Sequence, residues 1–420
     1  MKPKPNNAHL QTLALLLTLA LLPLQGKEQT PESQLLSGAL RKSGMPDNKE
    51  GVRIPLKSTF AGFVVDVKIN GKPVQLILDT GASASLLSQE AAKRVGLKTD
   101  RYDSWDVLDF TGTKVEVQRA LTKRISIGKA WTKNEPIFVT KMPKGLYDGL
   151  LGISTLADWD IRINPAEKTL TLLPSGQAKP HDDEFVVRLA HELVTPEAII
   201  SNPQGFRMMN LLIPVRLGSH VITVKPDTGS GGTLNVPSAL MNKFAPEVMK
   251  EALPALTQSV ALSGNVESRN AKLPEFTLGA DTLRELPMDV MDATPGTTGT
   301  IGLNLLRHYV MTFRFSAGEL RLKPLGTVQE ITRASTAGIN LGIDDAGRNI
   351  VLSVVPEGPG AKAGIRARDE LLEIEGVALK TMKPDQFAVF KRLPPGAIVK
   401  VLYRRGENKP VEAKLVLIKR

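Results

Sequence analysis

DTGAS at residues 79–83 and DTGSG at residues 227–231 are two copies of one motif, and they decide the fold of this chain. The apolar residues LIL at 76–78, within the strand-like segment QLIL, precede the first copy, so its aspartate is predicted to stand at the end of a strand. The glycine of each triplet permits a tight turn with close backbone approach. A hydrophobic segment that ends in glycine follows each copy, LLG up to Gly152 and TIG up to Gly302.

The sequence around the two motifs repeats in register. From Gly152 and Gly302 onward the halves match without a gap, so that Leu156, Trp159, Ile161, Ile163, Leu170 and Leu172 correspond to Leu306, Tyr309, Met311, Phe313, Leu320 and Leu322. Hairpin signals, Asn70-Gly71 and Gly218-Ser219, lie shortly before the two aspartates. Residues 55–174 and 205–325 are therefore predicted to be two copies of one β unit.

Two such units, related by a pseudo-twofold axis, would place Asp79 and Asp227 side by side. The threonine of each motif can then hydrogen-bond to the opposite copy, and each glycine-ended segment can pack behind its turn. Two carboxylates a few ångströms apart cannot both ionise cheaply, so the pair is expected to share one proton.

These motifs, with their downstream glycine partners, resemble the pepsin and retropepsin aspartic proteases over about residues 52–325. The resemblance implies a mainly β fold with two homologous acid-protease-like β-barrel lobes. It implies that Asp79 and Asp227 are the catalytic pair, which activates a water to hydrolyse a peptide or protein substrate. The residues implied to support the pair are Thr80, Gly81, Thr228, Gly229 and Ser230. Because one chain supplies both aspartates, catalysis is expected to be possible as a monomer.

The family's substrate-covering flap is a hairpin between the aspartate turn and the second glycine motif. VLDFTGTKVEV at 107–117 lies at that position, so Phe110, Thr111 and Gly112 are predicted at the flap tip. Two nearby aromatic residues, Trp105 and Tyr102, are candidates for a wall of the site or for core packing.

The two copies are unequal next to their aspartates. Ser230 follows the second triplet and offers a hydroxyl donor to Asp227, whereas Ala82 follows the first triplet. Lys225-Pro226 precedes only the second aspartate. Proline lacks a backbone donor, and Lys225 either lowers the pKa values of the pair or points to solvent.

The C-terminal part changes character. VVPEGPGAKAGIRARDELLEIEG, within about residues 328–420, resembles the PDZ domains of bacterial envelope proteases. The resemblance implies an α+β domain in which Ile339, Asn340, Leu341 and Gly342 fall at the carboxylate-binding loop. That loop would take the C-terminal peptide of a ligand, while the adjoining strand edge accepts an added strand. The alternative is a module that packs on the protease or forms dimers.

The N-terminus predicts export. Residues 1–26 carry Lys2 and Lys4 and then an apolar stretch too short to span a bilayer comfortably, which is typical of a secretory signal peptide. A periplasmic or secreted protein with no membrane span after cleavage is expected; an uncleaved signal anchor is the alternative. The predicted organisation is a signal peptide (1–26), a flexible lead-in (27–50), lobe 1 (51–174), a connecting segment (175–204), lobe 2 (205–325) and a PDZ-like domain (326–420).

Composition limits other functions. The net charge of +11 comes from scattered basic residues without interleaved aromatics, which does not favour nucleic-acid binding. The chain has no cysteine, and its five histidines show no metal-ligand spacing, so neither a metal nor a cofactor is expected. The alternative to an endopeptidase is a non-catalytic envelope scaffold that binds peptides and recruits partners.

Overall fold

The computed structural model describes the larger part of the chain and is mainly β. The described residues are 41–47, 50–59, 62–99, 104–109, 111–142, 147–193, 209–254, 259–261, 264–266, 268–293, 297–326, 335–343, 348–354, 356–381, 393 and 396–419. The predicted signal peptide lies outside them. No helix in these ranges is long and apolar enough to cross a membrane.

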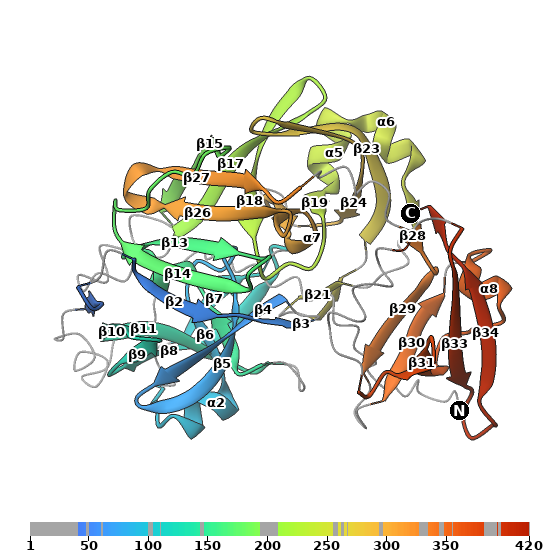
Figure 1. Cartoon of the computed structure of the whole chain (residues 1–420), viewed down its shortest axis with the longest axis horizontal. Coiled ribbons are helices and arrows are strands. Elements are labelled where there is room, and N and C mark those ends of the chain that lie inside the picture. Colours follow the sequence, from blue (N-terminus) through green and yellow to red (C-terminus); the bar gives the residue numbers. More distant parts are fainter. Residues whose placement is uncertain are drawn as a thin grey trace.

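The first half forms an eleven-stranded curled sheet around the Asp79 turn (Figure 1). Its order is β1-β10-β9-β4-β5-β12-β6-β11-β8-β7, with β3 paired to β4. The strands are β1 (Lys42–Gly44), β3 (Lys57–Thr59), β4 (Gly62–Ile69), β5 (Lys72–Leu78), β6 (Leu86–Ser88), β7 (Ser104–Leu108), β8 (Lys114–Thr122), β9 (Ile125–Ile127), β10 (Ala130–Lys133), β11 (Glu135–Thr140) and β12 (Gly149–Leu151). Two short helices, α2 (Gln89–Arg94) and α3 (Ile153–Leu156), accompany them.

The second half repeats this arrangement in an eight-stranded sheet of order β16-β17-β18-β25-β19-β24-β23-β20. The strands are β16 (Ala190–Leu193), β17 (Met209–Leu217), β18 (His220–Asp227), β19 (Leu234–Pro237), β20 (Leu253–Pro254), β23 (Ser268–Leu278), β24 (Asp281–Met291) and β25 (Gly299–Gly302). Its helices are α5 (Ser238–Phe244), α6 (Pro246–Glu251) and α7 (Leu303–Leu306), and a separate hairpin pairs β21 (Ser259–Ala261) with β22 (Gly264–Val266).

A six-stranded sheet joins the two halves, with strands from the first half and the second half side by side (Figure 1). Its order is β15 (Phe185–Arg188), β27 (Glu319–Pro324), β26 (Tyr309–Arg314), β13 (Trp159–Asn164), β14 (Thr169–Pro174) and β2 (Val52–Pro55), and the 3-10 turn η1 (Phe315–Ala317) joins β26 to β27. At its centre β13 and β26 run antiparallel, and Arg162 stands opposite Thr312. These two residues are equivalent in the sequence repeat, so the pseudo-twofold axis passes between them.

The local sequence signals gave the expected elements. Asn70 and Gly71 have φ of 52° and 83° and connect the antiparallel strands β4 and β5, as the hairpin signal predicted. Ser88 caps α2 by accepting the N–H of Ala91 at 3.1 Å, and Gly96 follows its end with a φ of 72°. The sequence SQEAAKRV at 88–95, with a serine able to cap it and a glycine after it, predicts a helix in this range, and α2 lies inside it.

Two predictions of irregular structure need correction. The described part of the lead-in, 41–47, contains β1, which pairs with β10 and is not a free segment. Residues 175–204, predicted as a connection, contribute β15 to the joining sheet and β16 to the second half. The exact domain boundaries stay predictions.

The C-terminal module has its own core and its own sheet, of order β29-β30-β31-β33-β34 with β32 paired to β31. The strands are β29 (Ile339–Ile343), β30 (Asn349–Val354), β31 (Glu370–Ile374), β32 (Val377–Ala378), β33 (Ile398–Arg404) and β34 (Val411–Val416), with helix α8 (Pro359–Lys362). A short pair of β28 (Ser335–Thr336) and β35 (Ile418–Lys419) closes it. Residues 339–342, predicted as a loop, lie in the edge strand β29, because they pair with β30.

Candidate active site

The two aspartates stand at equivalent places in the two halves. Asp79 directly follows β5, and Asp227 ends β18. Strand β12 lies parallel to β5, and β25 lies parallel to β18. Both aspartate side chains are fully buried, at 0% exposure. The strand ends therefore hold each carboxylate on rigid backbone, as the sequence predicted.

Threonines of the two motifs bind the halves to one another. Thr80 Oγ1 donates to the carbonyl of Pro226 at 2.6 Å and accepts the N–H of Thr228 at 3.1 Å. Reciprocally, Thr228 Oγ1 donates to the carbonyl of Leu78 at 2.7 Å and accepts the N–H of Thr80 at 3.1 Å. Each hydroxyl donates one hydrogen bond to the opposite copy and accepts one from it, as the sequence predicted.

Backbone amides fix the inner oxygen of each carboxylate. Asp79 Oδ1 accepts the N–H groups of Gly81 and Ala82, both at 2.9 Å. The amides of Gly229 and Ser230 donate to Asp227 Oδ1 at 2.9 and 3.0 Å. The two turns thus orient their carboxylates in the same way.

The glycines bring the two carboxylates together. A Cβ on Gly81 would lie 2.5 Å from Asp227 Cγ, and a Cβ on Gly229 would lie 2.5 Å from Asp79 Cγ. Real Cβ atoms do not approach another atom so closely, so only glycine leaves room for the carboxylate of the opposite half. The structure therefore places Asp79 and Asp227 next to each other across the pseudo-twofold axis.

This proximity changes the acidity of the pair. Burial, and then the negative charge of Asp227, raise the pKa of Asp79 well above its usual value, and the amides of Ala82 and Gly81 oppose the rise only in part. The outer oxygen, Asp79 Oδ2, is buried and has no hydrogen-bond partner among the described residues. An unpartnered buried carboxylate oxygen next to a second carboxylate is suited to accept a hydrogen bond from a water or to take a proton, and once protonated it can donate to a substrate carbonyl.

The glycine-ended segments pack behind the turns, as predicted. A Cβ on Gly152 would lie 2.3 Å from the carbonyl oxygen of Ala84, and a Cβ on Gly302 would lie 2.3 Å from that of Gly232. The N–H of Asp79 donates to the carbonyl of Leu151 at 3.1 Å.

Next to Asp227 the second half differs from the first. The side-chain amide of Asn235 donates to Ser230 Oγ at 3.2 Å and to Thr300 Oγ1 at 3.0 Å. Asn235 was not predicted from the sequence; it stands opposite Thr300 as Leu86 of the first half stands opposite Leu150, and this polar residue within an apolar repeat was the available signal. Lys225 is buried, at 4% exposure, so it does not point to solvent. The predicted donor bond from the Ser230 hydroxyl to Asp227 stays a prediction.

The predicted flap is a hairpin of β7 and β8, in which Leu108 stands opposite Lys114. Of the predicted tip residues, Phe110 lies outside the described residues, while Thr111 and Gly112 lie in the turn. Asp109 Oδ1 shapes this turn by accepting Thr111 Oγ1 at 2.6 Å. The role of the hairpin as a substrate cover stays a prediction.

This hairpin shares a buried cluster with the residues that follow Asp79. Val107 and Val117 share a buried cluster with Ala82 and Ala84. Trp105 packs against the same cluster, and the Arg119 guanidinium carbon lies 5.7 Å from its ring centroid, so Trp105 serves core packing. Tyr102 lies outside the described residues.

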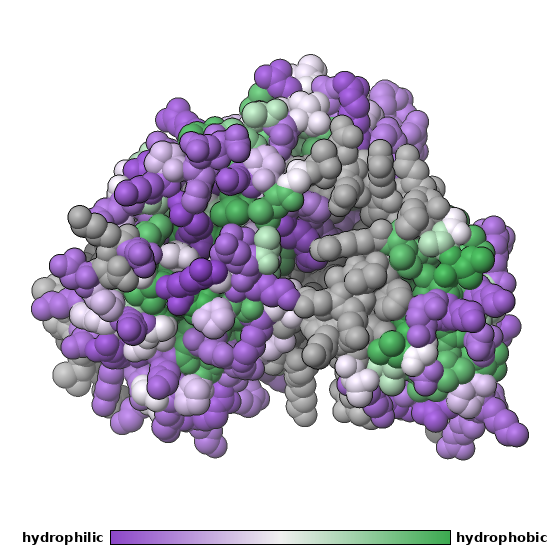
Figure 2. Space-filling model, viewed as in Figure 1, coloured by the Kyte–Doolittle hydropathy of each residue, from purple (hydrophilic) through white to green (hydrophobic). Residues whose placement is uncertain are grey.

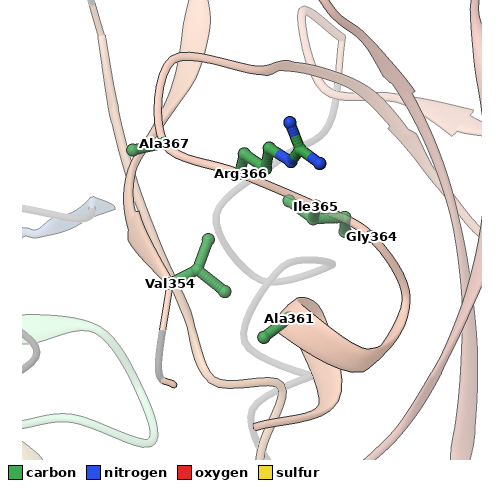
Figure 3. A pocket seen from close by; sticks show the side chains of 6 residues that line it. All are labelled: Val354, Ala361, Gly364, Ile365, Arg366 and Ala367. Carbon is green, nitrogen blue, oxygen red and sulfur yellow. The ribbon is translucent and has the colours of Figure 1, made fainter. Parts of the chain in front are cut away.

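A pocket of about 430 Å³ lies in the C-terminal module, where Val354, Ala361 and Ile365 contribute apolar walls and Arg366 lies beside them (Figure 3). It contains neither aspartate. Within the described ranges, no cluster of His, Asp and Glu side chains is arranged to hold a metal ion.

Comparisons with known proteins agree with this geometry. The family model for the gag-polyprotein putative aspartyl protease matches residues 65–158, and the PDZ domain model matches residues 350–405. A photosystem II D1 C-terminal processing protease of known structure matches with 23% identity and a TM-score of 0.20, over 21% of this chain and 24% of that chain; so partial a match carries no argument. The search of curated proteins gave no match. The chain thus contains a gag-polyprotein-type aspartyl protease domain and a C-terminal PDZ domain, matching a retropepsin-like protease with a PDZ module.

Proposed function

We propose that this protein is an exported aspartic endopeptidase in which Asp79 and Asp227 activate one water, and whose PDZ domain binds a peptide segment of a substrate or partner. The supporting observation is the mutual packing of each carboxylate on the glycine of the opposite motif, which makes the two acids neighbours in a buried site. The family model covers Asp79 but not Asp227, so the second acid rests on the repeat and on this geometry.

The raised pKa of Asp79 suits this chemistry, because it keeps one proton on the pair where a single surface aspartate would be ionised. The ionised carboxylate takes a proton from the water as the water oxygen attacks the scissile carbonyl carbon. The protonated carboxyl donates its proton to the carbonyl oxygen, which gives a neutral tetrahedral diol. The acid that took the proton from the water then donates it to the amide nitrogen, while the other carboxylate takes a proton from a diol hydroxyl. The C–N bond breaks, an amine and a carboxylic acid leave, and the pair again holds one proton.

A PDZ domain binds peptides by adding a strand to an exposed sheet edge, and β29 is such an edge strand. Apolar residues gather over this module in the space-filling view (Figure 2), and Ile398, Val416 and Ile418 are among the exposed large hydrophobic side chains. The edge position of β29 supports peptide binding, with Ile339, Asn340, Leu341 and Gly342 as the proposed contact; Ile398 and Val416 lie on β33 and β34, at the other end of the sheet, and are not part of that contact.

Turnover of a mixed peptide library, across pH and with and without a pepstatin-type inhibitor, tests the proposed activity. Asp79→Asn and Asp227→Asn are each expected to abolish cleavage, while Asp66→Asn, which removes an exposed carboxylate that pairs with Lys57, should keep it. Circular dichroism of all three variants checks the fold. Full activity in either active-site variant would exclude a shared pair, and absence of turnover by the unmodified protein at every pH would favour the non-catalytic scaffold.

A further inference from the structure

A buried ion-pair cluster lies beside the first lobe, at the start of the described chain. Arg41 immediately precedes β1, and its side chain is only 11% exposed. Its guanidinium contacts the carboxylate of Glu135 through Nε, the carboxylate of Asp158 at 2.5 Å and the carbonyl of Ser154 at 3.0 Å. Glu135 is buried at 1% side-chain exposure, so Arg41 is the counter-charge that a buried carboxylate requires.

A chain of hydrogen bonds leads from Glu135 toward the aspartate turn. Glu135 Oε1 accepts Thr155 Oγ1 at 3.2 Å. Thr155 Oγ1 lies 2.6 Å from Ser85 Oγ, and Ser85 Oγ accepts the N–H of Gly152 at 3.0 Å. A hydroxyl has one donor hydrogen. Since Thr155 gives its hydrogen to Glu135, the Ser85 hydroxyl must donate to Thr155, and the ionised Glu135 fixes the direction of every bond in the chain.

The end of this chain holds the catalytic turn. Gly152 packs against the carbonyl of Ala84, and the adjoining residues bond directly to the turn of the first motif. The N–H of Asp79 donates to Leu151, and the N–H of Ile153 donates to Ala82 at 2.9 Å. Displacement of Gly152 would therefore move the backbone that orients the Asp79 carboxylate.

The second lobe holds its glycine through a backbone bond. There the N–H of Gly302 donates to the backbone carbonyl of Thr233 at 3.0 Å, in place of a side-chain hydroxyl. The polar side chain behind that turn is the neutral Asn235. The hydroxyl contact to this glycine, which leads on to Glu135, is thus a feature of the first lobe.

We propose that Arg41 is a positioning residue for catalysis: through Glu135, Thr155 and Ser85 it fixes Gly152 and hence the Asp79 turn. The inference rests on the proposed endopeptidase function. On this proposal, the position of Asp79 depends on Arg41, a residue that lies before the predicted start of lobe 1.

Removal of Arg41 should act through the protonation of Glu135. Burial raises the pKa of Glu135, Arg41 opposes that rise, and Asp158, the other charged group facing it, adds to it. In Arg41→Gln the carboxylate would be buried without its counter-charge, so its pKa would rise further. Below that pKa Glu135 is neutral and tolerated, whereas above it the buried charge disrupts the hydrogen-bond chain. The loss of kcat in Arg41→Gln should therefore grow as the pH rises.

The test measures kcat and KM of Arg41→Gln and of the unmodified protein at each pH. The ratio of the variant's value to the unmodified value is used, because the titration of the two aspartates affects both proteins alike. We expect kcat about ten- to a hundredfold lower near neutral pH, a smaller loss in acid, and an unchanged KM, because Arg41 contacts no substrate. Arg41→Gln/Glu135→Gln should regain most of the activity at neutral pH, since both buried charges are gone. Arg53→Gln, which breaks the exposed pair with Glu167, is the matched control and should show no change.

A pH-independent ratio, or a double variant as impaired as the single one, would overturn the proposal. If Arg41→Gln does not fold, Thr155→Val cuts the chain without leaving an unpaired charge, and it should lower kcat equally at all pH values. Hydrogen exchange of a peptide covering 149–156 gives a readout that needs no activity: exchange should be faster in Arg41→Gln and in Thr155→Val than in Arg53→Gln. Unchanged exchange would refute the positioning role, whereas an inactive unmodified protein would refute only the proposed peptidase.

Discussion

Thr80 and Thr228 each accept the other's backbone N–H, at 3.1 Å in both directions, and each donates its hydroxyl hydrogen to the strand that carries the other's aspartate. Both side chains are buried, at 1% and 0% exposure. The two lobes are therefore joined at their aspartate turns by four buried hydrogen bonds, so the candidate active site and the interface between the lobes are one structure.

Thr228→Val should destabilise the protein and reduce catalysis together. Valine keeps the volume but leaves the Leu78 carbonyl and the Thr80 N–H without partners, at about 1–3 kcal/mol for each buried group. Urea unfolding followed by tryptophan fluorescence should show a lower midpoint, and kcat should fall with it. Thr277→Val, which loses an exposed hydroxyl contact with Thr282, should change the midpoint little. An unaltered midpoint in Thr228→Val would mean that the lobes do not depend on this contact.

Gly81→Ala and Gly229→Ala should each abolish activity. An added methyl group would lie 2.5 Å from the carboxylate carbon of the opposite aspartate, so one of the acids must move. Gly231→Ala is a matched control in the second turn, because its Cβ meets nothing within 4 Å and its φ is not positive. Activity assays on the three variants check this; normal turnover in Gly81→Ala would contradict the close approach of the two aspartates.

The raised pKa of Asp79 predicts how stability depends on pH. A group whose folded-state pKa lies above its unfolded value, near 3.8, stabilises the folded protein at low pH, and this contribution is lost as the pH rises through the folded pKa. The Asp79→Asn side chain cannot ionise, so the variant does not carry a buried negative charge at high pH. Its melting temperature should therefore exceed that of the unmodified protein by an amount that grows from pH 4 upward. Differential scanning calorimetry at several pH values measures this difference. Equal melting temperatures at all pH values would mean that Asp79 is not held close to Asp227.

Much of the fold followed from repetition in the sequence. Because the two halves match in register, the sequence predicted paired sheets, the packing of Gly152 and Gly302, and the meeting of Asp79 with Asp227. The Asn70-Gly71 hairpin and the helix capped by Ser88 followed from local signals, since turn geometry and capping need few residues.

Features that depend on long-range pairing could not be predicted. Arg41 looked like part of a polar lead-in, because its partners Glu135 and Asp158 are distant in sequence and only the fold brings them together. Residues 339–342 looked like a loop, yet edge strand β29 forms there because β30 lies alongside. Asn235 stands where the first half has the apolar Leu86, so the repeat predicted an apolar side chain at this position.

Acid should lower the stability of the PDZ domain, whereas it should raise the contribution of Asp79 to the stability of the lobes that carry the two aspartates. Asp369 is buried, at 1% exposure, and Arg405 donates to both of its oxygens at 2.8 Å. Burial alone would raise the pKa of Asp369, but the bonds from Arg405 and from the N–H of Arg366 outweigh it and lower the pKa. A depressed folded-state pKa stabilises the folded domain above pH 3.8, and that contribution is lost as the pH falls through the folded value.

Arg405→Gln should therefore lower the unfolding temperature of this domain at neutral pH and have little effect near pH 3. The chain has no cysteine, so a fluorophore on Lys414→Cys, an exposed site of β34, reports this domain specifically. All three tryptophans lie outside it, so their fluorescence follows the lobes and should not change. Lys409→Gln, at an exposed position, is the control. If Arg405→Gln lowers the unfolding temperature reported by the fluorophore equally at pH 3 and pH 7, the Arg405–Asp369 pair is not the cause of the pH dependence of this domain's stability.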